Sequence, residues 1–394
     1  MSFISELQKV LRENIRDYGM FIALFVIMAF FTAMTDGIFI SSRNISNLLN
    51  QTGYIAVLGV GMMLIIVIRH IDLSVGFLSG FLGALAAIAL ETWGLSVYIV
   101  LPMILLLGTL AGAATGTLVA VVGIPAFVAS LAGFLIYRGA ILVALQKTGT
   151  IIITDETFNA IGNGYIPDIP GLDTFLPGVH KLTILLGIVA VVLYVMSEIK
   201  NRNNKKAYNF EVLSMNIFVL KLVFVAGLIG SVTWILAGFR GLSWTVVLVI
   251  IVVSIYHFVT TQTVLGRHIY AVGGNPEAAE LSGISVRNTT YAVFCSMGML
   301  SGLSGIMFAS RLQSATMTAG TLFELDAIAA AFVGGASATG GVGKVTGALV
   351  GALVMTSLTS GMNLMSIDIS YQYMVRGVVL AAAVIFDVAT RGKA

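Results

Sequence analysis

The chain has 394 residues, of which 58% are hydrophobic and only 10% are charged, and its net charge is +3. A soluble domain carries roughly 25% charged residues. This composition cannot cover a water-exposed surface, so it excludes a soluble enzyme, a nucleic-acid-binding protein and a secreted scaffold. The chain must instead be solvated by a lipid bilayer, and its long continuous apolar runs favour helices over an outer-membrane barrel.

The N-terminal residues 1–18 place apolar side chains at helical spacing among charges, which predicts an interfacial helix on the membrane. Twelve apolar segments follow, and each predicts a membrane span. The segment 325–337 is short and rich in Ala and Gly, so it could instead be a half-helix or a re-entrant element. The predicted fold class is an all-α integral membrane protein with about twelve transmembrane helices, at 19–34, 53–69, 74–92, 97–122, 125–146, 182–197, 217–237, 244–262, 291–311, 325–337, 345–363 and 373–390.

The distribution of Lys and Arg predicts the orientation, because cytoplasmic loops carry an excess of these residues. They are dense in 1–18, 198–216, 263–290 and the tail after residue 390, and sparse in the loops between. The loop 147–181 is net acidic. We therefore expect 147–181 to lie outside, the basic segments to lie in the cytoplasm, and both termini to be cytoplasmic.

Charged residues inside apolar segments are informative, because a charge at mid-bilayer costs roughly 2.5–3.5 kcal/mol on insertion scales. The densest cluster is RHIDLSVG at 69–76. One interpretation is a short turn in which Asp72 or Ser74 caps the next helix. The other is a break that enters the membrane beside a transport path, with Asp72, Ser74 and Gly76 at the path or its gate. The two roles can coexist.

Further charges lie in later segments. Asp326 begins the short segment and is a fourth candidate for the path or gate. Arg138 could pair with Glu324 or Asp326. Arg376 and Asp387 are about three helical turns apart, so we expect Arg376 to reach outward and Asp387 inward.

The sequence shows no catalytic constellation and no metal-ligand set. Its four His residues are scattered, and Cys295 is the single cysteine. The segment 335–344 resembles a phosphate-binding loop but departs from that pattern at Gly341 and Val345, so it predicts a tight turn. We expect no ATP site and no cofactor in this chain, and any ATP hydrolysis would need another polypeptide.

The loop 263–290 contains the signals of a short helix. Asn275 suits an N-cap, Pro276 the first helical position and Gly283 the C-terminal turn. This helix is either an ordinary surface helix or a docking element for a partner.

Several motifs resemble a known family. EAAELSG at 277–283 fits the Glu-Ala-Ala-x-x-x-Gly signature of bacterial ABC importer permeases. Four blocks resemble, in order, those of the ribose/xylose/galactose-type monosaccharide permeases: RHIDLSVG (69–76), GRHIYAVGGNPEAAELSGI (266–284), ELDAIAAAFVGGASATGGVG (324–343) and GMNLMSIDISYQYMVRGVVLAAAV (361–384). The helix pair at 182–237 resembles an insertion in the xylose and multiple-monosaccharide branch.

The resemblance implies a permease subunit of an ATP-driven monosaccharide importer in the bacterial inner membrane. Its ten-helix core would carry the inserted pair. Two copies would form the path, a sugar-binding protein would deliver the monosaccharide outside, and an ABC ATPase would dock on Glu277, Ala278, Ala279 and Gly283. The implied regions are the interfacial helix 1–18, a first helix group 19–146, the outer loop 147–181, the pair 182–237, and a second group 238–394 that contains the coupling segment 263–290.

Two other classes remain as alternatives. An ion-coupled secondary transporter of a small polar solute would need an intramembrane carboxylate relay and no docking helix. A membrane enzyme is disfavoured because no catalytic constellation is present. The sequence names no sugar, and it shows no aromatic and carboxylate pocket that would bind one.

Overall fold

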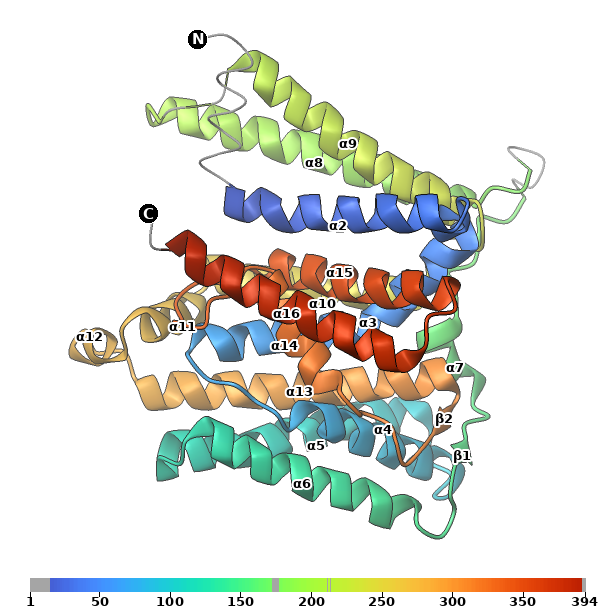
Figure 1. Cartoon of the computed structure of the whole chain (residues 1–394), viewed down its shortest axis with the longest axis vertical. Coiled ribbons are helices and arrows are strands. Elements are labelled where there is room, and N and C mark those ends of the chain that lie inside the picture. Colours follow the sequence, from blue (N-terminus) through green and yellow to red (C-terminus); the bar gives the residue numbers. More distant parts are fainter. Residues whose placement is uncertain (1–14, 172–176, 211, 213, 392–394) are drawn as a thin grey trace. The chain divides into compact units, whose positions relative to one another are not determined.

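The computed structural model describes residues 15–171, 177–210, 212 and 214–391 (Figure 1). The predicted interfacial helix over 1–18 lies almost wholly outside these residues. The helices, in chain order, are α2 (Ile15–Met34), α3 (Ser42–Val67), α4 (Val75–Glu91), α5 (Val97–Thr117), α6 (Ala126–Leu145), α7 (Glu156–Asn163), α8 (Lys181–Ala207), α9 (Met215–Ala237), α10 (Trp244–Gln262), α11 (Val264–Gly274), α12 (Pro276–Leu281), α13 (Val286–Leu312), α14 (Phe323–Val333), α15 (Val345–Leu364) and α16 (Ile369–Arg391).

Short elements complete the fold. A 3₁₀ turn, η1, covers Ile38–Ile40, and a π-helical turn, η2, extends α5 over Leu118–Val122. Strand β1 (Ile151–Ile152) pairs antiparallel with β2 (Ser314–Ala315), and Ile151 lies opposite Ala315.

The all-α membrane fold predicted from composition is confirmed, but the count of twelve spans is not. In the described part of the chain, eight helices are long and apolar enough to cross a membrane, and three shorter apolar helices cover Gly19–Met34, Val75–Glu91 and Ile369–Ile385. The segment expected at 325–337 forms α14, which has 11 residues. Such a helix is about 16 Å long, half of a hydrocarbon core of about 30 Å. It is therefore a short element and not a full span.

The chain folds as two compact units. The smaller unit includes Ile40–Asn47 and Tyr165–Ser243. Within it, α8 and α9 pack on each other, and Lys221 pairs with Glu198 at 2.8 Å between Nζ and Oε2. The larger unit includes Met20–Phe39, Leu48–Gly164 and the chain from Trp244 onward.

The core of the larger unit forms around α13, which packs against α4 and α5 (Figure 1). Small residues make this packing close: a Cβ added to Gly298 would overlap the carbonyl oxygen of Gly108 and crowd the backbone of Gly112. Without a hydrophobic driving force in lipid, helices associate through such close backbone contacts. The glycine spacing of α5 therefore sets its distance from α13.

Helices α4 and α14 begin at a point where the backbone before α14 touches the backbone of α4. Helix α3 ends at Val67, and α4 begins only at Val75, after the RHIDLS segment. A Cβ added to Gly76 would crowd the carbonyl of Gly320, and one added to Gly320 would overlap the carbonyl of Gly76. Because Gly320 lies three residues before α14 and an added Cβ at Gly76 also meets Glu324, the first turns of α4 and α14 lie against each other.

Candidate functional site

The break between α3 and α4 is built around Asp72, whose side chain is only 3% exposed. Its Oδ1 accepts hydrogen bonds from the backbone N–H of Ser74 at 2.9 Å and from the Ser74 hydroxyl at 2.6 Å. Ser74 packs against Gly133 of α6. Asp72 thus closes the turn that leads into α4, whereas Ser74, the N-cap residue of α4, makes no side-chain capping bond. This geometry is compatible with a second role at a path.

Gly76 links this break to α14. A Cβ at Gly76 would overlap Oε2 of Glu324, whose side chain is 5% exposed. That oxygen has no hydrogen-bond partner within the described residues. The structure therefore brings the RHIDLSVG and ELDAIAAAFVGG motifs together, although 248 positions separate Gly76 from Glu324.

Asp326 forms an ion pair with Arg376 of α16. Nη1 of Arg376 lies 3.1 Å from Oδ1 and 3.2 Å from Oδ2 of Asp326. The same guanidinium donates from Nε and Nη2 to the hydroxyl of Thr359 on α15, at 3.1 and 2.7 Å. Arg376 therefore pairs with a half-buried acid on a neighbouring helix, and the expectation that it reaches toward the outer side stays a prediction. The Asp387 side chain lies outside the described residues.

Arg138 does not pair with Glu324 or Asp326 in this structure. Its guanidinium carbon lies 5.4 Å from the centre of the Phe77 ring, so a cation–π contact holds it against α4. Phe77 in turn packs edge-on against Phe134.

The cytoplasmic loops predicted from charge converge on the end of α3. Arg69, in a left-handed conformation with φ +64°, donates from Nε to the carbonyl of Gly273 at 2.7 Å and from Nη2 to the carbonyl of Gly274. These carbonyls end α11, where the helix dipole favours a cation. The turn after α14 joins them, because the Gly341 N–H donates to the Val67 carbonyl at 2.8 Å.

The predicted short helix is α12. Asn275 ends α11 and also caps α12, because its Oδ1 accepts the Ala278 N–H at 3.1 Å. Gly283 has φ +81°, with open space around an added Cβ, so its backbone conformation and not crowding requires glycine. Ala279 is 4% exposed and packs into the core of its own chain. Glu277 and Ala278 face outward.

Leu281 is not among the residues predicted from the sequence to contact a partner, yet it is 92% exposed at the end of α12. The available signal was a single large apolar residue in a six-residue helix within a polar loop. Lone exposed apolar residues are common on proteins, so exposure alone does not mark Leu281 as functional. Its position on the capped helix α12 is what makes it a candidate contact for a partner.

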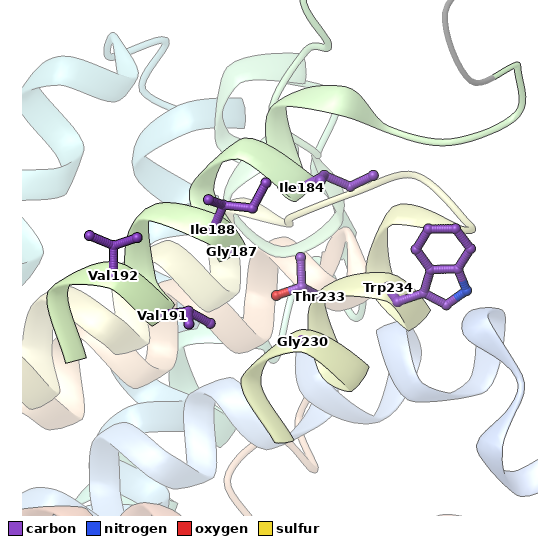
Figure 2. A pocket seen from close by; sticks show the side chains of 8 residues that line it. All are labelled: Ile184, Gly187, Ile188, Val191, Val192, Gly230, Thr233 and Trp234. Atoms are coloured by element: carbon purple, nitrogen blue, oxygen red, sulfur yellow. The ribbon is translucent and has the colours of Figure 1, made fainter. Parts of the chain in front are cut away.

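A hollow of about 230 Å³ lies between α8 and α9 in the smaller unit (Figure 2). Its lining is apolar except for Thr233 and the indole N–H of Trp234, and the Thr233 hydroxyl already donates to the Ile229 carbonyl at 2.7 Å. Such a surface suits an acyl chain better than a polar solute.

Comparisons with known proteins agree with these motifs. The family model described as branched-chain amino acid transport system / permease component matches residues 44–384. The xylose transport system permease protein of Haemophilus influenzae is 37% identical over 98% of this chain and 99% of its own. The corresponding protein of Escherichia coli is 37% identical over 96% and 93%. The ribose import permease protein of Haemophilus influenzae is 33% identical over 93% and 91%.

No solved structure gives a significant match. The family model and these relatives nevertheless cover nearly the whole chain, including the break, α12, α14 and most of α16. The chain therefore belongs to the family of branched-chain amino acid transport system permease components and is a multi-pass membrane permease.

Proposed function

We propose that this chain is the permease subunit of an ATP-driven importer of monosaccharides, with xylose or several sugars as substrates. The xylose and ribose permeases among its relatives support the substrate class. The single observation that carries the coupling to ATP is α12, a capped helix whose Leu281 projects almost fully into solvent. A solute carrier without a partner has no use for such an element.

The proposed partners follow from the family. A separate ABC ATPase hydrolyses ATP and docks on Glu277, Ala278, Leu281 and the turn at Gly283. A sugar-binding protein delivers the substrate on the opposite side, and a second copy of the chain completes the path. Helices α8 and α9 are the proposed addition to a ten-helix core, and the basic loops and both termini face the cytoplasm.

A mechanical link connects the proposed docking site to the membrane interior. Asn275 is both the C-cap of α11 and the N-cap of α12, so a displacement of α12 moves the end of α11. Arg69 holds that end through the Gly273 and Gly274 carbonyls. Arg69 is also the second residue of the break that leads to Asp72 and α4. Movement driven by the ATPase thus reaches the break through two hydrogen bonds.

The proposed path passes the first turns of α4 and α14. Asp72, Ser74 and Gly76 shape one side, and Asp326 lies on the first turn of the other helix. Because Gly76 and Gly320 meet without side chains, a small shift of one helix start changes the opening beside them.

One observation favours a second candidate, an ion-coupled secondary transporter. The buried Glu324 oxygen without a described partner is the kind of group that a coupling proton would use. This candidate needs no ATPase, so the two functions make opposite predictions.

The test is reconstitution in proteoliposomes with the ABC ATPase and the sugar-binding protein proposed as its partners. We expect uptake of D-xylose or D-ribose that needs ATP and both partners. Uptake by the permease alone, driven by a proton gradient, would replace the ABC importer with the secondary transporter.

A further inference from the structure

The ion pair of Asp326 and Arg376 joins two apolar helices, α14 and α16, and is not fully enclosed. Arg376 is seven residues into α16, which places it about 10 Å along that helix. Its side chain is 21% exposed, and that of Asp326 is 17% exposed. Because acyl chains cannot solvate such groups, the exposed atoms need a polar environment on the open side.

A pocket opens on this side. It has a volume of about 330 Å³, at the small end of the roughly 300–1,000 Å³ typical of ligand sites. Helices α14, α15 and α16 form it, together with Leu322, which has φ +67° and immediately precedes α14. Its lining is apolar apart from Asp326, Arg376 and Tyr373, and the Tyr373 ring is 47% exposed.

The polar groups have unused hydrogen-bonding capacity. A guanidinium carries five N–H donors. Arg376 directs one from Nε and one from Nη2 to Thr359 and uses Nη1 for the Asp326 carboxylate. Nη1 already donates to both Asp326 oxygens, so Nη2 supplies the N–H that remains, and each Asp326 oxygen can accept a further bond. The pocket therefore offers donors and acceptors side by side.

The chemistry of this set selects a class of ligand. The two charges cancel, so the pocket favours neither a free cation nor a free anion. Neighbouring hydroxyls of a neutral sugar donate to a carboxylate and accept from a guanidinium at the same time. The apolar lining and the open Tyr373 ring suit the C–H face of a sugar ring, as in pockets where a few polar groups orient a mainly apolar contact.

We propose that the pocket between α14, α15 and α16 is a binding station for a neutral monosaccharide on its way through the permease. Arg376 and Asp326 bind its hydroxyls, Thr359 holds the guanidinium in place, and Tyr373 packs on its apolar face. The station adjoins the helix start that touches the break at Gly76, so it lies next to the proposed gate. This inference rests on the proposed function and adds the residues that recognise the sugar.

The first test compares two tyrosines of α16. Tyr373 lines the pocket, whereas Tyr371, 63% exposed on the same helix, does not. We expect Tyr373→Ala to lower ATP-driven uptake of D-xylose or D-ribose about fivefold to tenfold, the size of a lost aromatic contact. ATP hydrolysis stimulated by the binding protein should stay near its normal rate, and Tyr371→Ala should transport normally.

A second test does not depend on transport. In a Cys295→Ala background, Leu325→Cys places a thiol in the pocket lining, and Val378→Cys places one on α16 outside it. We expect D-xylose or D-ribose, delivered by the binding protein, to slow labelling of position 325 but not of position 378. Arg376→Lys keeps the positive charge but loses the planar guanidinium and its several N–H donors, so it should abolish this protection.

The outcomes separate the two levels of the proposal. If the unmodified complex imports no sugar, the proposed function fails. If it imports sugar while Tyr373→Ala matches Tyr371→Ala and sugar gives no protection at 325, the station is refuted. Labelling at 325 that a second copy of the chain or added lipid blocks, while sugar does not, assigns the pocket to that occupant and also refutes the station.

Discussion

Truncation of Leu281 is the sharpest test of how the permease receives energy from ATP. The side chain is 92% exposed in the isolated chain, so its removal should leave the stability of the permease unchanged. If it is buried on the ATPase, Leu281→Ala removes three carbons from that contact. At about 0.8 kcal/mol per buried CH₂, the loss is about 2.4 kcal/mol. This weakens ATPase binding about 60-fold.

The assay is the dissociation constant of the ATPase for the permease in nanodiscs, measured with the Leu281→Ala variant and the unmodified chain. Leu265→Ala is a matched control, because Leu265 is 40% exposed on α11, in the same segment 263–290. Thermal unfolding of the permease alone should be identical for all three. Equal ATPase affinities for the Leu281→Ala variant and the unmodified chain would refute α12 as the docking element.

Three further predictions concern other parts of the chain. Gly298→Val should destabilise the fold by about 1–3 kcal/mol or more, because its Cβ meets backbone; thermal unfolding should show no such loss for Gly227→Val, which has open space. Asp72→Ala should lower sugar uptake while membrane insertion persists, because Ser74 loses its acceptor; normal uptake would leave Asp72 as a cap only. Burial alone would raise the pKa of Asp168, but backbone N–H groups at the start of α8 lower it to about 2. Protection of that turn from hydrogen exchange should therefore hold above pH 4, weaken as pH falls toward 2, and be low throughout in Asp168→Asn; unchanged protection in that variant would contradict the cap.

The sequence predicts much of this fold because lipid imposes simple rules. Long apolar runs must form helices, and the runs at 97–122, 125–146 and 244–262 correspond closely to α5 with η2, α6 and α10. The predicted helix boundaries are wrong where a helix continues beyond the apolar run. Helix α3 begins at Ser42, 11 residues before the predicted start at 53, because polar residues such as Asn44 and Asn50 are accommodated in its first turns.

The site is less predictable, because it depends on pairs of residues far apart in the chain. Local patterns identified the cap at Asn275 and the turn at Gly283, which need only neighbouring residues. The pair of Asp326 and Arg376 spans 50 positions and requires knowing which faces of α14 and α16 meet. The sequence around Arg376 therefore did not indicate its partner, and the pocket between α14, α15 and α16 could not be predicted.

The last prediction concerns Arg69, which joins the docking segment to the break between α3 and α4. Loss of ATPase docking and loss of coupling to the break have different effects on transport, so a substitution at Arg69 can distinguish them. Its two hydrogen bonds to the end of α11 are the direct tie between the docking segment and the break. Asp72 fixes the far end of the break at Ser74, so a displacement of Arg69 must be taken up by the residues between them. Arg69→Gln should therefore leave ATPase binding and ATP hydrolysis intact while sugar uptake per ATP falls, whereas Leu281→Ala should lose the ATPase itself. If Arg69→Gln transports with normal efficiency, the energy reaches the path by another route, and the packing of the glycine turn at Gly341 against Val67 becomes the alternative link.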